Sequence, residues 1–293
     1  MNANGAGLQG LLARLLVDER ALQVFRQIPD SLVREYGLTV SQADALKGLD
    51  ATGLDFTART VRTKREDRLG QRFPLTFSLL RAAGRLDEVI DSYALATLPI
   101  RRREESRLLT EAQRFVTFLD GMSQPDLPPY TPDLARYELL RLDLSVAAAP
   151  EPAQADRRQA DDTPPADLDD ERIGTAVPVL SQNVLIGSFT YDVVGLVEKL
   201  LAGPCVPDAH KAPTCLVLVE AAEESSFLVY RVPPAVLAIL TRCDGSSTFR
   251  EIASTRLDGA SAGSILRGCL QRGIVRLRQG GNGSPGRPSI PRY

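Results

Sequence analysis

The stretch from Ala147 to Asp170 most constrains the fold, because it separates two regions with different hydrophobic patterns. It is rich in Ala, Pro, Gln and Asp and has no apolar periodicity, so it can bury little apolar surface. Apolar residues recur at helical spacing before it, and short β-branched runs follow it. With 293 residues the chain is long enough for two hydrophobic cores. We therefore expect two domains joined by a linker at residues 147–172.

The region before the linker, residues 1–146, is predicted to be an all-α domain. Its first apolar stripe has the i, i+3, i+4, i+7 spacing of an amphipathic helix and consists of Leu8, Leu11, Leu12, Leu15 and Leu16. Asp30 is expected to cap a short helix that stops at Gly37, and Thr39 or Ser41 to cap the next one. The region is thus predicted to consist of helices joined by tight turns.

The region after the linker, residues 173–278, is predicted to mix strands and helices. Strands are expected at 177–180, 184–189, 216–219, 227–232 and 274–277. Helices are expected at 191–201, 233–243, 248–257 and 261–272. Strands, three short helices and a returning strand make a winged-helix-like module. The tail at 279–293 lacks periodicity and is expected to be disordered. The predicted fold class is therefore α+β, a helical domain followed by this module.

Charge and cysteine usage exclude several classes of function. The chain has 35 basic and 37 acidic residues and a formal net charge of −2, so no overall charge directs it to nucleic acid or to a membrane. The four cysteines share no CxxC spacing, and the N-terminus has no long apolar run. We therefore expect a protein of the reducing cytoplasm, without a membrane or nucleic-acid partner.

Metal chemistry within the chain is not expected. His210 is the single histidine, and imidazole is the usual metal ligand and general base near neutral pH. Cys205 and Cys215 flank it, but a structural zinc site needs a fourth ligand nearby. Ser246 and Ser247 follow an Asp-Gly pair and are explained by a turn, since no histidine lies near them in sequence. We predict no catalytic and no metal-binding residue.

The C-terminal region carries a motif of about fifty residues. Residues 230–253 read Tyr-Arg-Val-Pro-Pro-Ala-Val-Leu-Ala-Ile-Leu-Thr-Arg-Cys-Asp-Gly-Ser-Ser-Thr-Phe-Arg-Glu-Ile-Ala, and a segment ending in Gly273-Ile-Val follows. Asp244-Gly245 supplies a turn, and Thr248 with Glu251 forms a capping box. The motif resembles the PqqD-like leader-peptide recognition fold of ribosomal peptide maturation. This resemblance implies a winged-helix-like domain that binds a precursor peptide.

The N-terminal region carries a second resemblance. Its segments are Arg72–Leu80, Phe115–Leu119 and Leu127–Glu138, with Phe189–Asp192 at the start of the following domain. They are similar to the methanobactin-type partner proteins, which form heterodimers with multinuclear non-heme iron-dependent oxidative enzymes. Residues 8–55 fall outside the resemblance. The resemblance to these partner proteins implies a non-catalytic subunit that docks such an enzyme, with the iron in the partner and no cofactor in this chain.

The resemblance also suggests where a peptide would bind. In PqqD-like modules the leader adds as an extended strand beside the sheet, next to a helix that supplies side-chain pockets. The candidate residues here are Leu216, Leu218, Phe227, Val229, Tyr230, Arg231, Ile265, Leu266, Arg267 and Leu270. Arg267, Arg272 and Arg276 are candidates to pair with an acidic leader. The alternative for each apolar candidate is a place in the core.

A winged-helix regulator that reads DNA is the competing hypothesis. Its recognition helix would be 261–272, which has just two arginines among small and apolar residues. The run Arg101–Arg103 is followed directly by Glu104 and Glu105, which is typical of a mixed-charge helix face. Peptide recognition therefore remains the preferred prediction.

Overall fold

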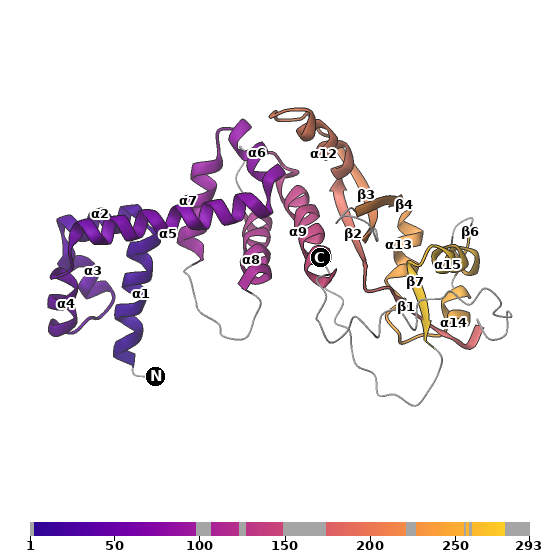
Figure 1. The fold of residues 1–293 in the computed structure, drawn as a ribbon, viewed down its shortest axis with the longest axis horizontal. Helices are drawn as coiled ribbons and strands as arrows, with labels where there is room; N and C mark the ends of the chain where they lie inside the picture. The colour runs from indigo at the N-terminus through magenta and orange to yellow at the C-terminus, as the bar shows by residue number, and fades with distance from the viewer. Residues whose placement is uncertain are drawn as a thin grey trace. The chain divides into compact units, whose positions relative to one another are not determined.

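The computed structural model describes residues 3–97, 107–122, 127–148, 174–220, 227–254, 256–257 and 260–278. The fold is mixed α+β, with many helices and small antiparallel sheets (Figure 1). Every regular element in the described residues up to 148 is a helix, and all strands lie after residue 176. This confirms the predicted α+β class, and the winged-helix-like arrangement of the second domain stays a prediction. The predicted linker falls almost wholly, and the predicted tail wholly, outside the described residues.

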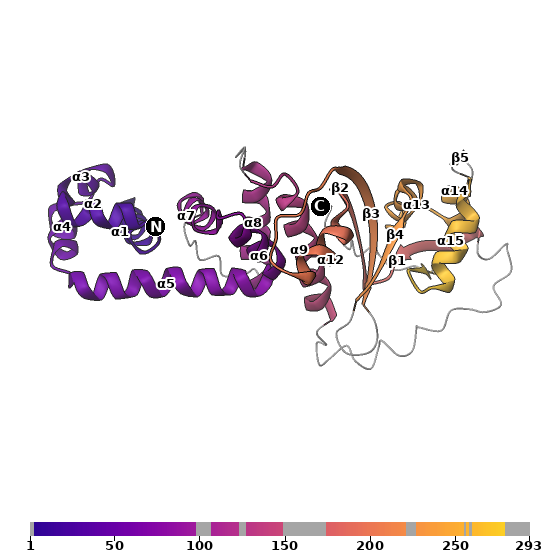
Figure 2. The same cartoon turned by 90° about the horizontal axis from the view of Figure 1, so that it is seen from above.

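The first helices form a small bundle on one long helix. Their bounds are α1 Ala3–Val17, α2 Glu19–Gln27, α3 Pro29–Glu35, α4 Val40–Lys47 and α5 Ala51–Arg72. In Figure 2, α1 to α4 gather at the N-terminal half of α5. Thr39, one of the two predicted caps, caps α4 in a capping box with Gln42. The prediction for Asp30 was wrong: Ile28 is the N-cap of α3 and Pro29 starts the helix, because proline's fixed φ suits the first helical position.

The next helices surround a cluster of aromatic rings. Their bounds are α6 Pro74–Ala82, α7 Leu86–Ala96, α8 Arg107–Gly121 and α9 Thr131–Ala148. Phe115 of α8 is fully buried, with its ring centroid 5.2 Å from Phe73, 6.1 Å from Phe77 and 5.1 Å from Tyr93. Tilted and edge-on ring pairs of this kind add stabilisation beyond buried area. These rings thus hold α5, α6, α7 and α8 together.

The elements after residue 173 follow the predicted order. They are β1 Val177–Leu180, β2 Val184–Tyr191, α12 Val193–Ala202, β3 Lys211–Glu220, β4 Phe227–Val232, α13 Pro234–Leu240, α14 Phe249–Ala253, β5 Arg256–Leu257, β6 Ala260–Ser261, α15 Ala262–Gln271 and β7 Val275–Arg278. The helix predicted at 248–257 ends early, and Leu257 pairs with Ala260 in a two-residue ladder instead. Thr248 and Glu251 form the predicted capping box.

Two antiparallel sheets organise these elements. One has the strand order β2-β3-β4, so β3 is central, and the other pairs β1 with β7. The register of β3 and β4 places Cys215 opposite Val232 and Glu220 opposite Phe227, so the strands predicted at 216–219 and 227–232 pair as a hairpin. Gly245 and Gly273 have φ of +83° and +66°, the left-handed conformation that glycine adopts without strain. Gly245 lies in the predicted turn after α13, and Gly273 follows the end of α15.

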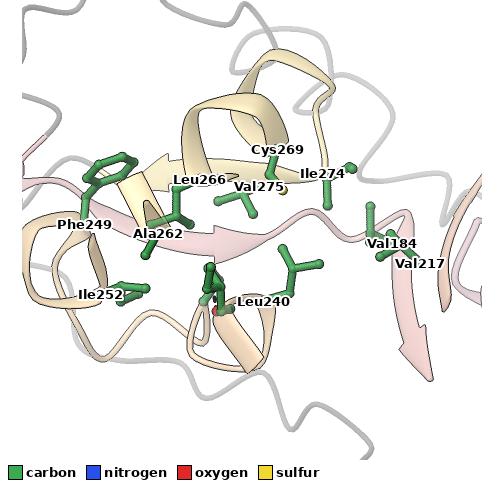
Figure 3. Packing of buried hydrophobic residues seen from close by; sticks show 12 residues of the cluster. Val184, Val217, Leu240, Phe249, Ile252, Ala262, Leu266, Cys269, Ile274 and Val275 are labelled. Atoms are coloured by element: carbon green, nitrogen blue, oxygen red, sulfur yellow. Dashed lines mark hydrogen bonds between the residues drawn. The ribbon is translucent and has the colours of Figure 1, made fainter. Parts of the chain in front are cut away.

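The core of this region lies between the strands and the three short helices (Figure 3). Leu240 of α13, Ile252 of α14 and Leu266 of α15 are fully buried in it. Val184 and Val217 join the same cluster from β2 and β3, which fixes the face of the three-stranded sheet that points toward the helices. Alternate residues on each strand therefore point to the opposite face.

Contacts divide the chain into two compact units. The helical unit contains Met1–Ala135 and Val197–Pro207, and the mixed unit contains Arg136–Leu196 and Asp208–Tyr293. The domain boundaries proposed from the sequence, with a linker at 147–172, stay a prediction. Across the described ranges, each helix is too short or too polar to cross a lipid bilayer.

Candidate functional site

The edge of β4 is the feature of the mixed unit best suited to receive another chain. β3 pairs with one side of β4, and no strand in the described residues pairs with the other. An unpaired strand edge presents backbone N–H and C=O groups to any extended segment that lies beside it. β2 forms the other edge of the sheet, but its exposed side chains, Ser188 and Thr190, are polar.

Two apolar side chains of β4 face the helical side of the sheet and remain in contact with solvent. Tyr230 lies opposite Val217 and Leu228 opposite Val219 in the register of the hairpin. Because paired residues of an antiparallel ladder point to the same face, both side chains share the face of the buried core. Leu228 is 49% exposed and Tyr230 39% exposed. The edge therefore offers an apolar surface as well as free backbone groups.

The other predicted residues of β4 point to the opposite face. Phe227 and Val229 are partly buried there, and the Arg141 guanidinium of α9 lies 5.4 Å from the Phe227 ring centroid. Arg231 is exposed and forms an ion pair of 2.9 Å with Asp192. These side chains flank the edge but do not form one surface with Leu228 and Tyr230.

Leu216 and Leu218 lie in the central strand. Both are 0% exposed, and β3 is paired along both of its edges. A peptide can reach neither the side chains nor the backbone of these two residues without displacing a strand. Strand addition is therefore available at β4 and not at β3.

The candidates on α15 divide in the same way. Leu266 is fully buried in the core, and Ile265 and Leu270 are partly buried against that core. Arg267 is exposed. The accessible candidates on α15 are thus Arg267 and the outer parts of Ile265 and Leu270.

A cavity at the end of the hairpin was not predicted from the sequence. It has a volume of about 340 Å³ and is lined by Asp192, Thr214, Cys215, Arg231, Val232 and Pro234 among others. Burial raises the pKa of the Cys215 thiol, so the neutral thiol is favoured. The Asp192–Arg231 ion pair forms one wall. No local signal in the sequence marks this cavity, because it depends on the register of β3 with β4.

Leu228 was also missed in the sequence analysis, although the alternation along β4 could have indicated it.

Cysteine and histidine side chains do not gather into a metal site in the described part of the chain. There, no group of three or more His, Cys, Asp or Glu side chains is placed to hold a metal ion. Cys205 and His210 are both exposed, and Cys215 is half-buried.

Comparison with known proteins adds no relative. A scan against protein-family models gives no match. A search of curated proteins gives none either. The resemblance to PqqD-like modules and to methanobactin-type partner proteins therefore stays a prediction from the residues quoted above.

Proposed function

We propose that this chain is a non-catalytic partner subunit in the biosynthesis of a ribosomally synthesised, post-translationally modified peptide. It binds the leader of the precursor peptide and docks a multinuclear non-heme iron-dependent oxygenase in the cytoplasm. The unpaired edge of β4, with Leu228 and Tyr230 half-exposed beside it, is the observation that carries this proposal.

The leader adds to β4 as a further antiparallel or parallel strand. Main-chain hydrogen bonds to the free edge supply affinity, and alternate side chains of the peptide supply specificity. The peptide side chains that point toward the helices contact Leu228 and Tyr230. The peptide side chains that point away from the helices contact Val229 and Arg231. Basic side chains such as Arg267 favour an acidic leader by speeding association.

The contribution of this chain to the reaction is positioning. The helical unit docks the enzyme, whose own residues hold the iron, and the winged-helix-like module holds the precursor. Binding both partners at once raises the effective concentration of the modified residue at the iron site. Catalysis is therefore assigned to the partner enzyme, and no residue of this chain is assigned a catalytic role.

The test is co-expression of this chain with a candidate iron enzyme and its precursor peptide, followed by co-purification and a measurement of peptide affinity. Proline is then placed at Val229 and, in a second variant, at Tyr230, because proline removes a backbone donor. Neighbouring residues of an antiparallel strand direct their N–H groups to opposite edges. One variant therefore breaks the ladder with β3 and the other removes a donor only from the free edge.

The proposal predicts that the variant with an intact β3–β4 ladder, verified by amide hydrogen exchange, loses peptide affinity by ten-fold or more. Replacing exposed Ser188 of β2 by proline is the control at the other edge of the sheet. Unchanged peptide affinity in both β4 variants would contradict strand addition. Sequence-dependent DNA binding without a peptide complex would instead favour the winged-helix regulator.

A further inference from the structure

A second cavity lies within the helical unit, between α5 and α7. Its volume is about 380 Å³, within the range typical of small-molecule sites. Part of its lining is apolar and comes from Val17 at the end of α1, Leu69 of α5, and Ile90 and Tyr93 of α7. The remainder is charged. This combination suits a ligand with an aliphatic stem and a charged end.

Two of the basic residues that line the cavity are already neutralised. Arg62 Nη1 donates to Glu19 Oε2 at 2.9 Å. Arg65 Nε donates to Glu111 Oε1 at 2.8 Å, and its Nη2 donates to the Oγ1 and the main-chain oxygen of Thr97 at 2.7 and 3.0 Å. The Arg65 guanidinium also lies 4.5 Å from the ring centroid of Tyr93. These contacts fix both guanidinium groups in the wall.

Of the acidic residues of the lining, Glu19 is paired with Arg62, and the others are not paired in this way. Within the described residues, Glu66, Asp87 and Asp91 make no hydrogen bond or ion pair, and Arg59, which is exposed, is the remaining basic group of the lining. Asp87 and Asp91 are four residues apart on α7, where like charges repel. Burial raises the pKa of the Asp91 carboxyl, and Glu19 and Asp87 add to this effect, whereas Arg62 and Arg20 oppose it. A cation beside Asp91 relieves this repulsion.

We infer that this cavity binds a lysine or arginine side chain of a partner protein, with the cation between Asp87 and Asp91 and the aliphatic stem against the partly exposed Ile90. The shared chemistry is an alkyl chain that ends in a cation, which a free diamine also offers. The inference rests on the helical unit alone and is independent of peptide binding at β4.

The test is a titration of the full-length protein, followed by the methyl NMR signals of Leu69 and Ile90. The probes are Nα-acetyl-lysine methylamide and Nα-acetyl-arginine methylamide. Nα-acetyl-norleucine methylamide is the uncharged control for the aliphatic stem, and putrescine represents a free diamine. The variant Asp87→Asn/Asp91→Asn removes both carboxylates, and Asp67→Asn, an exposed residue of α5 outside the cavity lining, is the matched control.

We expect the lysine or arginine derivative to shift the Leu69 and Ile90 signals, and the double variant to weaken this binding by about ten-fold or more. The Asp67→Asn variant keeps the affinity, and the norleucine derivative binds at least about ten-fold more weakly than the basic probes. Equal binding of the norleucine derivative, or unchanged affinity in the double variant, would overturn the inference. Tighter binding of putrescine than of either amino-acid derivative would overturn the assignment to a partner's side chain.

Discussion

The two units satisfy their polar groups in different ways. In the helical unit, helix surfaces are joined by ion pairs such as Arg62–Glu19 and Arg65–Glu111. In the mixed unit, the backbone groups along one side of β4 have no strand partner in the described residues. A surface covered by side-chain pairs offers another chain no main-chain contacts, whereas an unpaired strand edge presents free backbone N–H and C=O groups. The proposed recognition of a peptide by the mixed unit and of a basic side chain by the helical unit follows this difference.

The largest expected effect is loss of the aromatic cluster of the helical unit. Replacing Phe115 by alanine removes a fully buried ring that contacts Phe73, Phe77 and Tyr93, and is expected to cost about 3–5 kcal/mol of unfolding free energy. Amide hydrogen exchange should show faster exchange in α6 to α8. If exchange in the mixed unit rose equally, the two units would not be independent in stability.

A smaller effect is expected from crowding the sheet of the mixed unit. A Cβ atom at Gly187 of β2 would lie 2.7 Å from Leu140 Cδ1 of α9 and 3.0 Å from the Phe189 ring. Gly187→Val is therefore expected to cost about 1–3 kcal/mol in urea unfolding. Gly203→Val is the control, since no atom lies within 4 Å of a Cβ there. Equal stability of the two variants would show that α9 does not pack closely on this sheet.

The buried thiols should make the mixed unit sensitive to alkaline pH. Burial, with a further contribution from Cys269, raises the pKa of Cys243 to about 12 from 9.0. The folded state then holds the thiol proton more tightly than the unfolded chain, so this stability is complete below pH 9 and is lost as the pH rises toward 12. Between pH 8 and pH 10 the loss is about 1.4 kcal/mol. Cys243→Ala should abolish this part of the dependence, measured by urea unfolding at both pH values.

The smallest effect is expected at the N-terminus of α14. Thr248→Ala removes the hydroxyl that accepts from the Glu251 N–H, at a cost of about 1 kcal/mol. Thr248→Ser keeps the acceptor and should retain most of the stability. Thermal unfolding of the two variants provides the measurement. Identical midpoints would show that the capping box contributes nothing to the mixed unit.

Local signals in the sequence predicted the parts of the fold that depend on neighbouring residues. The capping box of Thr248 with Glu251, the left-handed Gly245 and the β3–β4 hairpin all follow from residue types within a few positions. The pairing of β1 with β7 joins residues almost a hundred positions apart. No pattern within either strand specifies such a partner, because any exposed strand edge can accept another.

The candidate site was predicted only in part for the same reason. The sequence identified β4, but it could not distinguish a central strand from an edge, and so it included the buried residues Leu216 and Leu218. It also gave no indication of the cavity between α5 and α7. That cavity is formed by Asp91 and Leu69, which come together only when the helices pack. Strand edges and cavities depend on tertiary packing, so they cannot be predicted from local patterns in a single sequence.

Amide hydrogen exchange can show whether a precursor leader adds as a strand to the free edge of β4. Exchange would be measured over Phe227–Val232 with and without a saturating leader peptide. If the leader binds there, alternate amides of β4, those not bonded to β3, become strongly protected when the peptide binds, while β2 exchange is unchanged. Peptide binding without any new protection in β4 would show that the leader binds elsewhere.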